Sequence, residues 1–119
     1  MRDFRELKVW QRAHQLALSV CKNTRSFPKD EVYGLTGQMR RACTSIPANI
    51  AEGGGRGTDP EMVRFLRIAM GSAAELEYLL LLARDLGYLN GTIHDHMASE
   101  VMQVRRMLTS FIQRLKANG

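Results

Sequence analysis

Apolar residues recur every three or four positions along almost the whole chain, and few residues interrupt the pattern. This spacing places apolar side chains on one face of an α-helix. The 119 residues include only three prolines, and four of the ten glycines lie together between positions 53 and 57. No stretch of sequence has the two-residue period of a β-strand, and none repeats. The sequence therefore predicts an all-α fold with one domain over residues 1–119.

Four long helical segments are predicted, over residues 7–26, 31–52, 59–86 and 93–116. The pair Phe27-Pro28 ends the first, because a residue that precedes proline disfavours the helical conformation. A turn between the third and fourth helical segments is expected at Asn90-Gly91-Thr92. Four helices of similar length with short connections most economically form an antiparallel up-down-up-down bundle.

The second helix carries unusual interruptions. Pro47 removes a backbone donor, so we expect a kink near Cys43. The run from residue 53 to 57 is predicted to be a glycine turn that ends this helix. Thr58 and Glu61 have the spacing of a capping box and begin the third helix, and Gly87 caps its end.

The apolar surface of the third helix is wider than a monomer needs. A helix on the surface of a single domain requires a stripe only slightly wider than about 100°, whereas here more than half of the circumference is apolar. We therefore expect this helix to be central or shared with another copy of the chain. The apolar positions are Met62, Phe65, Leu66, Ile68, Ala69, Met70, Ala73, Leu76, Leu79, Leu80, Leu81, Ala83 and Leu86.

The chain is basic, with a net charge of +5 and 17 lysines and arginines, most of them arginine. Arginine suits contacts with phosphate because its guanidinium group can bind two oxygens at once. Such charge supports contact with a nucleic-acid backbone but little reading of bases. The alternative is a solvated face with neutralising partners, such as Glu61 beside Arg64. The candidate nucleic-acid-binding residues are Arg5, Lys8, Arg12, Arg40, Arg64, Arg67, Arg105 and Arg106.

A stripe of polar residues lies beside the apolar face of the second helix, within about 80° on a helical wheel. Residues in that position are expected to be half-buried and to need hydrogen-bond partners. We interpret the stripe as a structural network that fixes helix register or subunit pairing, with a ligand or nucleic-acid site as the alternative. Its members are Gln38, Arg41, Ser45, Asn49 and Glu52, with Ser72 and Glu75 of the third helix as partners.

The sequence offers little for catalysis or a cofactor. Metal centres in helical bundles use Glu-x-x-His pairs, and that pattern is missing. The nearest alternative is a metal-dependent enzyme that uses His94, Asp95, His96 and Glu100, which we expect instead to be exposed helix residues. The glycine turn lacks the lysine of a phosphate-binding loop. We therefore predict no catalytic residues, no metal and no cofactor.

The cellular location of the protein is predicted from the N-terminal residues, from the length of the apolar stretches and from the positions of the two cysteines. The N-terminal residues are charged and lack the apolar run of a signal peptide. No apolar stretch is long enough for a membrane span. Cys21 and Cys43 fall on apolar helical faces, where reduced thiols are expected. These observations predict a cytoplasmic protein that does not enter a membrane.

The run Ser45-Ile-Pro-Ala-Asn-Ile-Ala-Glu-Gly53 resembles the signature of a bacterial four-helix-bundle family encoded by intervening sequences within large-subunit ribosomal RNA genes. The resemblance extends from about Phe4 to Leu89. Further matching stretches are Leu7 to Ala13, Phe27-Pro28 with Glu31, Tyr33-Gly34-Leu35, Gln38 to Ala42, Ala69 to Ser72, and Glu75-Leu76-Glu77.

This resemblance carries expectations about assembly and partners. The family is similar to the accessory variability protein of diversity-generating retroelements, which forms a pentameric barrel with a basic surface and binds nucleic acid and a reverse transcriptase. No enzymatic activity is attached to the family. We therefore expect a non-enzymatic homo-oligomer, a pentamer, that binds RNA or DNA as an accessory of a nucleoprotein, with a reverse transcriptase or ribonucleoprotein as a further partner. The alternative is a protein-interaction or scaffold module without nucleic-acid contact.

Overall fold

The computed structural model describes residues 3–118, and every regular element in this range is helical. Met1, Arg2 and Gly119, the outermost residues of the predicted domain, lie outside the described residues. The all-α prediction is confirmed, and so is the four-helix bundle. The long helices are α1 (Lys8–Asn23), α2 (Leu35–Gly55), α3 (Asp59–Asp85) and α4 (Gly91–Asn118), and two 3-10 turns are η1 (Phe4–Glu6) and η2 (Lys29–Glu31).

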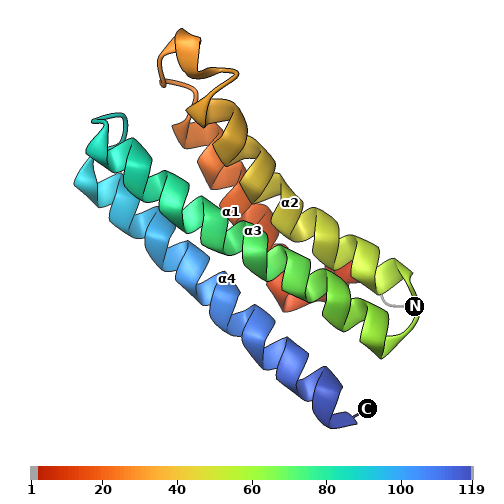
Figure 1. Ribbon diagram of the computed structural model, residues 1–119. Helices are drawn as coiled ribbons and strands as arrows, with labels where there is room; N and C mark the ends of the chain where they lie inside the picture. The colour runs from red at the N-terminus through yellow and green to blue at the C-terminus, as the bar shows by residue number, and fades with distance from the viewer. Residues whose placement is uncertain (1–2, 119) are drawn as a thin grey trace.

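The helices lie side by side along the long axis of a bundle that measures 46 × 23 × 20 Å (Figure 1). The helix α1 packs against α2 and α4, and α3 packs against the same two helices. Each helix therefore has two neighbours and turns one apolar face inward.

A single core runs the length of the bundle and receives side chains from all four helices. Leu16 of α1, Ile46 of α2, Leu66 of α3 and Leu108 of α4 are each fully buried. Burial of one such side chain contributes about 1.5–3 kcal/mol to stability. The three- and four-residue spacing seen in the sequence is what brings these residues onto one face.

The first helix ends three residues earlier than predicted, at Asn23. The hydroxyl of Thr24 donates to the carbonyl of Val20 at 2.9 Å. The chain then turns so that Phe27 enters the core, where its ring lies 5.4 Å from that of Tyr88. Burial of an aromatic ring outweighs one further turn of helix.

The second helix begins at Leu35, four residues later than predicted. Gly34 has φ −104° and ψ −118°, outside the helical region, and separates α2 from η2. Glu31, expected inside the helix, instead accepts a hydrogen bond from the Leu35 amide at 3.2 Å. It therefore satisfies one of the free donors at the start of α2.

The predicted glycine turn is largely wrong, because α2 continues to Gly55. A Cβ atom on Gly53 would lie 2.8 Å from Met62 Sδ, so the glycine lets α2 approach α3 closely. Packing of this kind overrides the low helix propensity of glycine. Within the run from residue 53 to 57, only Gly57, with φ +86°, has the left-handed conformation of a turn. The helix also continues through the buried Pro47, and the kink near Cys43 stays a prediction.

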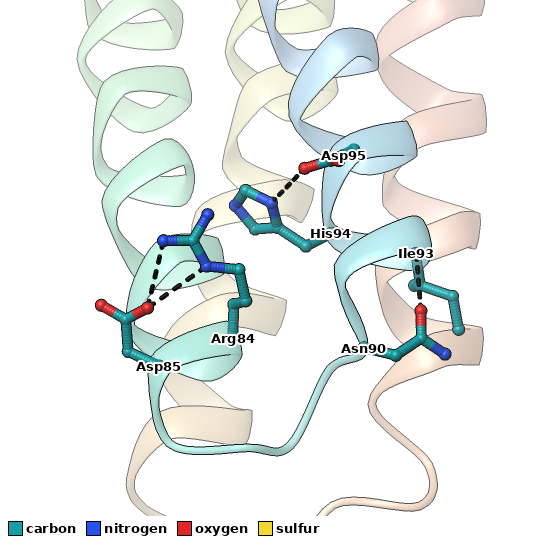
Figure 2. A network of polar contacts seen from close by, with 6 residues as sticks. All are labelled: Arg84, Asp85, Asn90, Ile93, His94 and Asp95. Carbon is teal, nitrogen blue, oxygen red and sulfur yellow. Dashed lines mark hydrogen bonds and ion pairs between the residues drawn. The ribbon is translucent and has the colours of Figure 1, made fainter.

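The ends of α3 follow the sequence prediction. The side chain of Thr58 accepts from the Glu61 amide at 3.3 Å, and Gly87 has φ +82° just beyond the last turn. The helix α4 begins two residues earlier than predicted, because Asn90 caps it by accepting from the Ile93 amide at 2.8 Å (Figure 2).

Candidate functional site

Two hydroxyl groups and one side-chain amide of the predicted polar stripe meet between α2 and α3. The Ser45 and Ser72 hydroxyls lie 2.9 Å apart and share a hydrogen bond. Asn49 donates to the Ser45 hydroxyl at 2.9 Å and to the Ser45 carbonyl at 2.8 Å. All three side chains are half-buried. The contact joins residues 27 positions apart and is suited to holding the two helices in register.

The expectation that the stripe residues are half-buried is wrong for Gln38 and Arg41, and their expected partner Glu75 is exposed as well. Gln38, Arg41 and Glu75 are exposed, and with Ser45 and Ser72 they line a shallow hollow of about 360 Å³. They lie at the outer edge of the contact between α2 and α3, where water can solvate them.

Glu52 stands apart from the other members of the stripe, and the expectation that it is half-buried is wrong. It is exposed and pairs with Arg56 at 3.0 Å on the same side of the molecule. The reason is that α2 extends to Gly55, which puts Arg56 one turn beyond Glu52.

Three of the predicted nucleic-acid-binding residues already have acidic partners. Arg5 pairs with Asp3 at 3.4 Å, and Arg64 pairs with Glu61 at 2.9 Å. Arg105 of α4 pairs with Glu77 of α3, and both side chains are partly buried. A cation that is neutralised in this way contributes less to binding an anion, because the partner carboxylate repels the ligand.

Four other predicted residues are exposed cations without such partners. Within residues 3–118, no acidic group pairs with Lys8, Arg12, Arg67 or Arg106. They come from α1, α3 and α4. The free positive charge is therefore distributed over three helices.

The last predicted residue, Arg40, lies in a hollow of about 360 Å³ beside the end of α1. Its Nε donates to the Thr24 hydroxyl at 3.1 Å. Arg25 and Lys29 line the same hollow, and the sequence analysis missed both. They lie in the irregular segment between α1 and α2, where helical spacing gives no clue to which side chains converge.

Two of the three histidines, His94 and His96, each pair with a carboxylate. His94 is buried, its ring extends from α4 toward α3, and its Nδ1 lies 3.0 Å from Asp95 (Figure 2). His96 is exposed and lies 3.2 Å from Glu100. The part of the chain that the structure describes contains no group of three or more His, Cys, Asp or Glu residues that could hold a metal ion. The expectation that all four of these residues are exposed is wrong for His94, which occupies a core position of α4, and for Glu100, which is half-buried.

The two cysteines are free thiols on the neighbouring helices α1 and α2. Cys43 is fully buried, and its thiol lies 3.3 Å from the Arg40 carbonyl. Burial, with a smaller effect from Cys21, raises the pKa of Cys43 to about 12. A thiol with so high a pKa supplies almost no thiolate and is a poor nucleophile near neutral pH.

Comparisons with known proteins agree on the fold. Residues 5–110 match the model of a family described as 23S rRNA-intervening sequence protein. A crystal structure from Bacteroides thetaiotaomicron, described as a protein with unknown function from the S23 ribosomal protein family, is 23% identical with a TM-score of 0.81. The match covers 88% of this chain and 95% of that one. A search of curated proteins finds no match. Among the described helices, none is both long and apolar enough to span a bilayer.

Proposed function

The chain belongs to the 23S rRNA-intervening sequence protein family, and on that premise we propose that it is a non-enzymatic, homo-oligomeric helical bundle that binds the backbone of RNA or DNA. In this proposal it acts in the cytoplasm as an accessory of a larger nucleoprotein. The observation that carries the proposal is the set of four exposed cations on α1, α3 and α4 that have no acidic partner among residues 3–118.

The chemistry of these cations favours phosphate contact over base recognition. Lys8 and Arg12 lie on α1, Arg67 lies on α3, and Arg106 lies on α4. Lysine and arginine that neutralise phosphates release condensed counterions, so the affinity falls steeply with salt. The net charge of +5 per chain attracts a polyanion at long range.

Self-association is supported by apolar side chains on the outer surface of α3. Ile68, Tyr78 and Leu81 are exposed there. Packing of this surface against a second copy would remove it from water, and each added copy would add five positive charges. We set the number of copies at five from the resemblance to the pentameric retroelement protein, and the helix order as antiparallel, up-down-up-down, from the short connections between helices.

Salt-dependent gel shifts with RNA and DNA of matched sequence test the proposal. The variant R67Q removes a free cation, whereas R64Q removes a cation that Glu61 already neutralises. We expect R67Q to reduce the slope of log K against log salt by about 0.7–0.9 per copy that touches the polymer. We expect R64Q to have a smaller effect. Absence of binding by the wild-type protein at low salt would overturn the proposal.

The competing function is a scaffold that binds proteins and not nucleic acid. The exposed Tyr78 and Leu81 favour it, because aromatic and aliphatic side chains are typical of protein interfaces. The same gel shifts distinguish the two functions, since a scaffold leaves the mobility of RNA and DNA unchanged at every salt concentration.

A further inference from the structure

Where α1 ends and α2 begins, the irregular segment between them closes over a hollow of about 360 Å³. We name this hollow the corner pocket. Apolar groups from Phe27, Pro28 and Val32 form part of its wall, and the remaining lining is polar or cationic. Its lining residues are Thr24, Arg25, Phe27, Pro28, Lys29, Val32, Thr36 and Arg40.

The corner pocket brings three cations together. Within residues 3–118, no carboxylate forms an ion pair with Arg25, Lys29 or Arg40. The Arg40 side chain is held in place, because its Nε donates to the Thr24 hydroxyl at 3.1 Å. Thr24 is itself 1% exposed. A cation that is already held loses less conformational freedom when it binds an anion.

The nearest acidic residues in the sequence do not line the corner pocket. Asp30 and Glu31 follow Lys29, and Glu31 is engaged by two other groups. Its Oε1 accepts from the Leu35 amide at 3.2 Å, and its Oε2 accepts from the Tyr88 hydroxyl at 3.0 Å. The lining of the corner pocket therefore carries three positive groups and no negative one.

A second, independent observation concerns Thr36, which lines the corner pocket from the first turn of α2. Thr36 is 4% exposed. Among the described residues, its hydroxyl is the one buried polar side-chain group that has no hydrogen-bond partner. Buried hydroxyls are normally bonded, so such a group calls for an explanation. An oxygen-rich anion bound in the adjacent hollow would supply the missing acceptor.

The first turn of α2 borders the corner pocket through Thr36. The first amide of the helix, that of Leu35, is already bonded to the Glu31 carboxylate, so the positive charge of the site comes from the side chains of Arg25, Lys29 and Arg40. Three cations and an unpartnered hydroxyl thus converge on one hollow.

We propose that the corner pocket binds a phosphate group, with Arg25, Lys29 and Arg40 supplying the charge and Thr36 a hydroxyl donor. This site is distinct from the exposed cations of α1, α3 and α4 and does not depend on them. The phosphate group comes either from the backbone of a polynucleotide or from a terminal or free phosphate, and the experiment below separates these sources.

Binding is measured by NMR on the isotope-labelled protein, from the backbone amide of Thr36 and the side-chain Nε–H of Arg40. The titrants are inorganic phosphate, a short oligonucleotide with a 5′-phosphate, and the same oligonucleotide with a 5′-hydroxyl. Inorganic sulfate at equal ionic strength checks for general anion binding. We expect both signals to shift with phosphate.

The three titrants identify the source of the phosphate. Equal shifts with both oligonucleotides assign the site to backbone phosphates. Shifts that require the 5′-phosphate, or that occur with inorganic phosphate alone, assign it to a terminal or free phosphate. If no titrant moves either signal, the proposal is overturned.

Two variants and a matched control test the residues. We expect K29Q to weaken phosphate binding about tenfold, because it removes a charge-assisted contact. The control K22Q removes an exposed lysine of α1 that lies outside the corner pocket and should leave the affinity unchanged. Equal affinities of K29Q and the wild-type protein would contradict the assignment.

The variant T36V keeps the shape of the side chain and removes the hydroxyl. We expect it to weaken phosphate binding while its melting temperature in phosphate-free buffer is equal to or higher than that of the wild-type protein, since no hydrogen bond is lost. Unchanged phosphate affinity in a folded T36V would exclude a role for the hydroxyl. The variant R67Q should retain this phosphate response, so failure of the proposed polynucleotide binding is distinguishable from failure of the corner pocket.

Discussion

Gly53 of α2 lies so close to Phe65 of α3 that a Cβ atom added to the glycine would sit 2.9 Å from the Phe65 Cβ. The pair belongs to the packing of α2 against α3. Because this packing favours the helical conformation at Gly53, α2 continues through the three consecutive glycines and ends at Gly55.

The substitution G53A should therefore destabilise the protein, although alanine favours helix more than glycine does. Overpacking costs about 1–3 kcal/mol, and the gain in helix propensity offsets only about 1 kcal/mol of this. The control is G55A in the same helix, where a Cβ atom meets nothing within 4 Å. We expect G55A to stabilise the protein in urea denaturation. If both G53A and G55A stabilised the protein, the close approach of α2 to α3 at Gly53 would be refuted.

The Ser45–Ser72 contact should appear as a coupling energy between α2 and α3. S72A should lower the free energy of unfolding by about 0.5–1.5 kcal/mol, which is typical of one hydrogen bond. S45A should cost more, because the Ser45 hydroxyl also accepts from Asn49. The double variant should cost less than the sum of the two, because the shared bond is lost only once. Exactly additive losses in a double-mutant cycle would show that the hydroxyls do not interact in solution.

Arg105 and Arg106 are neighbours in sequence but should respond to substitution differently. R105Q breaks the pair with Glu77 and should lower the free energy of unfolding by up to about 1 kcal/mol, a small value because both side chains are partly exposed. R106Q should leave stability within about 0.5 kcal/mol of the wild-type value and reduce the salt dependence of nucleic-acid binding. Thermal melts together with gel shifts on both variants provide the measurement, and a reversed pattern would contradict these roles.

The buried Cys43 thiol should make stability fall at alkaline pH. Its pKa is raised from an ordinary value of 9.0 to about 12, mainly by burial. As pH rises through this range, the unfolded chain releases a proton that the folded chain keeps, so unfolding becomes more favourable. The stabilisation is complete below pH 9.0 and is lost toward pH 12. Comparison with C43A in urea melts isolates the effect, since lysines and tyrosines titrate equally in both. A stability difference that does not change with pH would show an unperturbed thiol.

The outer surface of α3 should govern self-association. Tyr78 is 59% exposed there, and a glutamate in its place puts a charge into any interface that uses this surface. We expect Y78E to shift the mass measured by light scattering toward the monomer without a change in helix content. The control is L18E on α1, where Leu18 is 52% exposed. Dissociation by L18E alone would place the contact on α1 instead.

The sequence predicts the helices well because their signal is local. Residues such as Leu16 and Leu108 recur at helical spacing, and burial of that face determines the fold. The helix ends are predicted less well, since tertiary contacts decide them. Phe27 leaves its helix to enter the core, and Gly53 stays in its helix because α3 packs against it.

The candidate sites are predicted only in part, for a different physical reason. The composition and the adjacent arginine pairs indicate that arginines are numerous. Which arginines can bind an anion depends on which of them form ion pairs with carboxylates. Glu77 and Arg105 are 28 positions apart, and no helical spacing reveals that they meet. The corner pocket is assembled from α2 and from the segment between α1 and α2, so no helical spacing in the sequence marks Arg25 and Lys29.

The start of α1 and the end of α4 line a common groove, which Glu6 to Val9 share with Met107 to Asn118. Both ends of the described chain therefore lie at the same end of the bundle (Figure 1). A short glycine-serine linker could join them, with new termini opened at the exposed turn around Gly57. Such a circular permutant would keep the four-helix core and bring α1 and α4 together as consecutive helices.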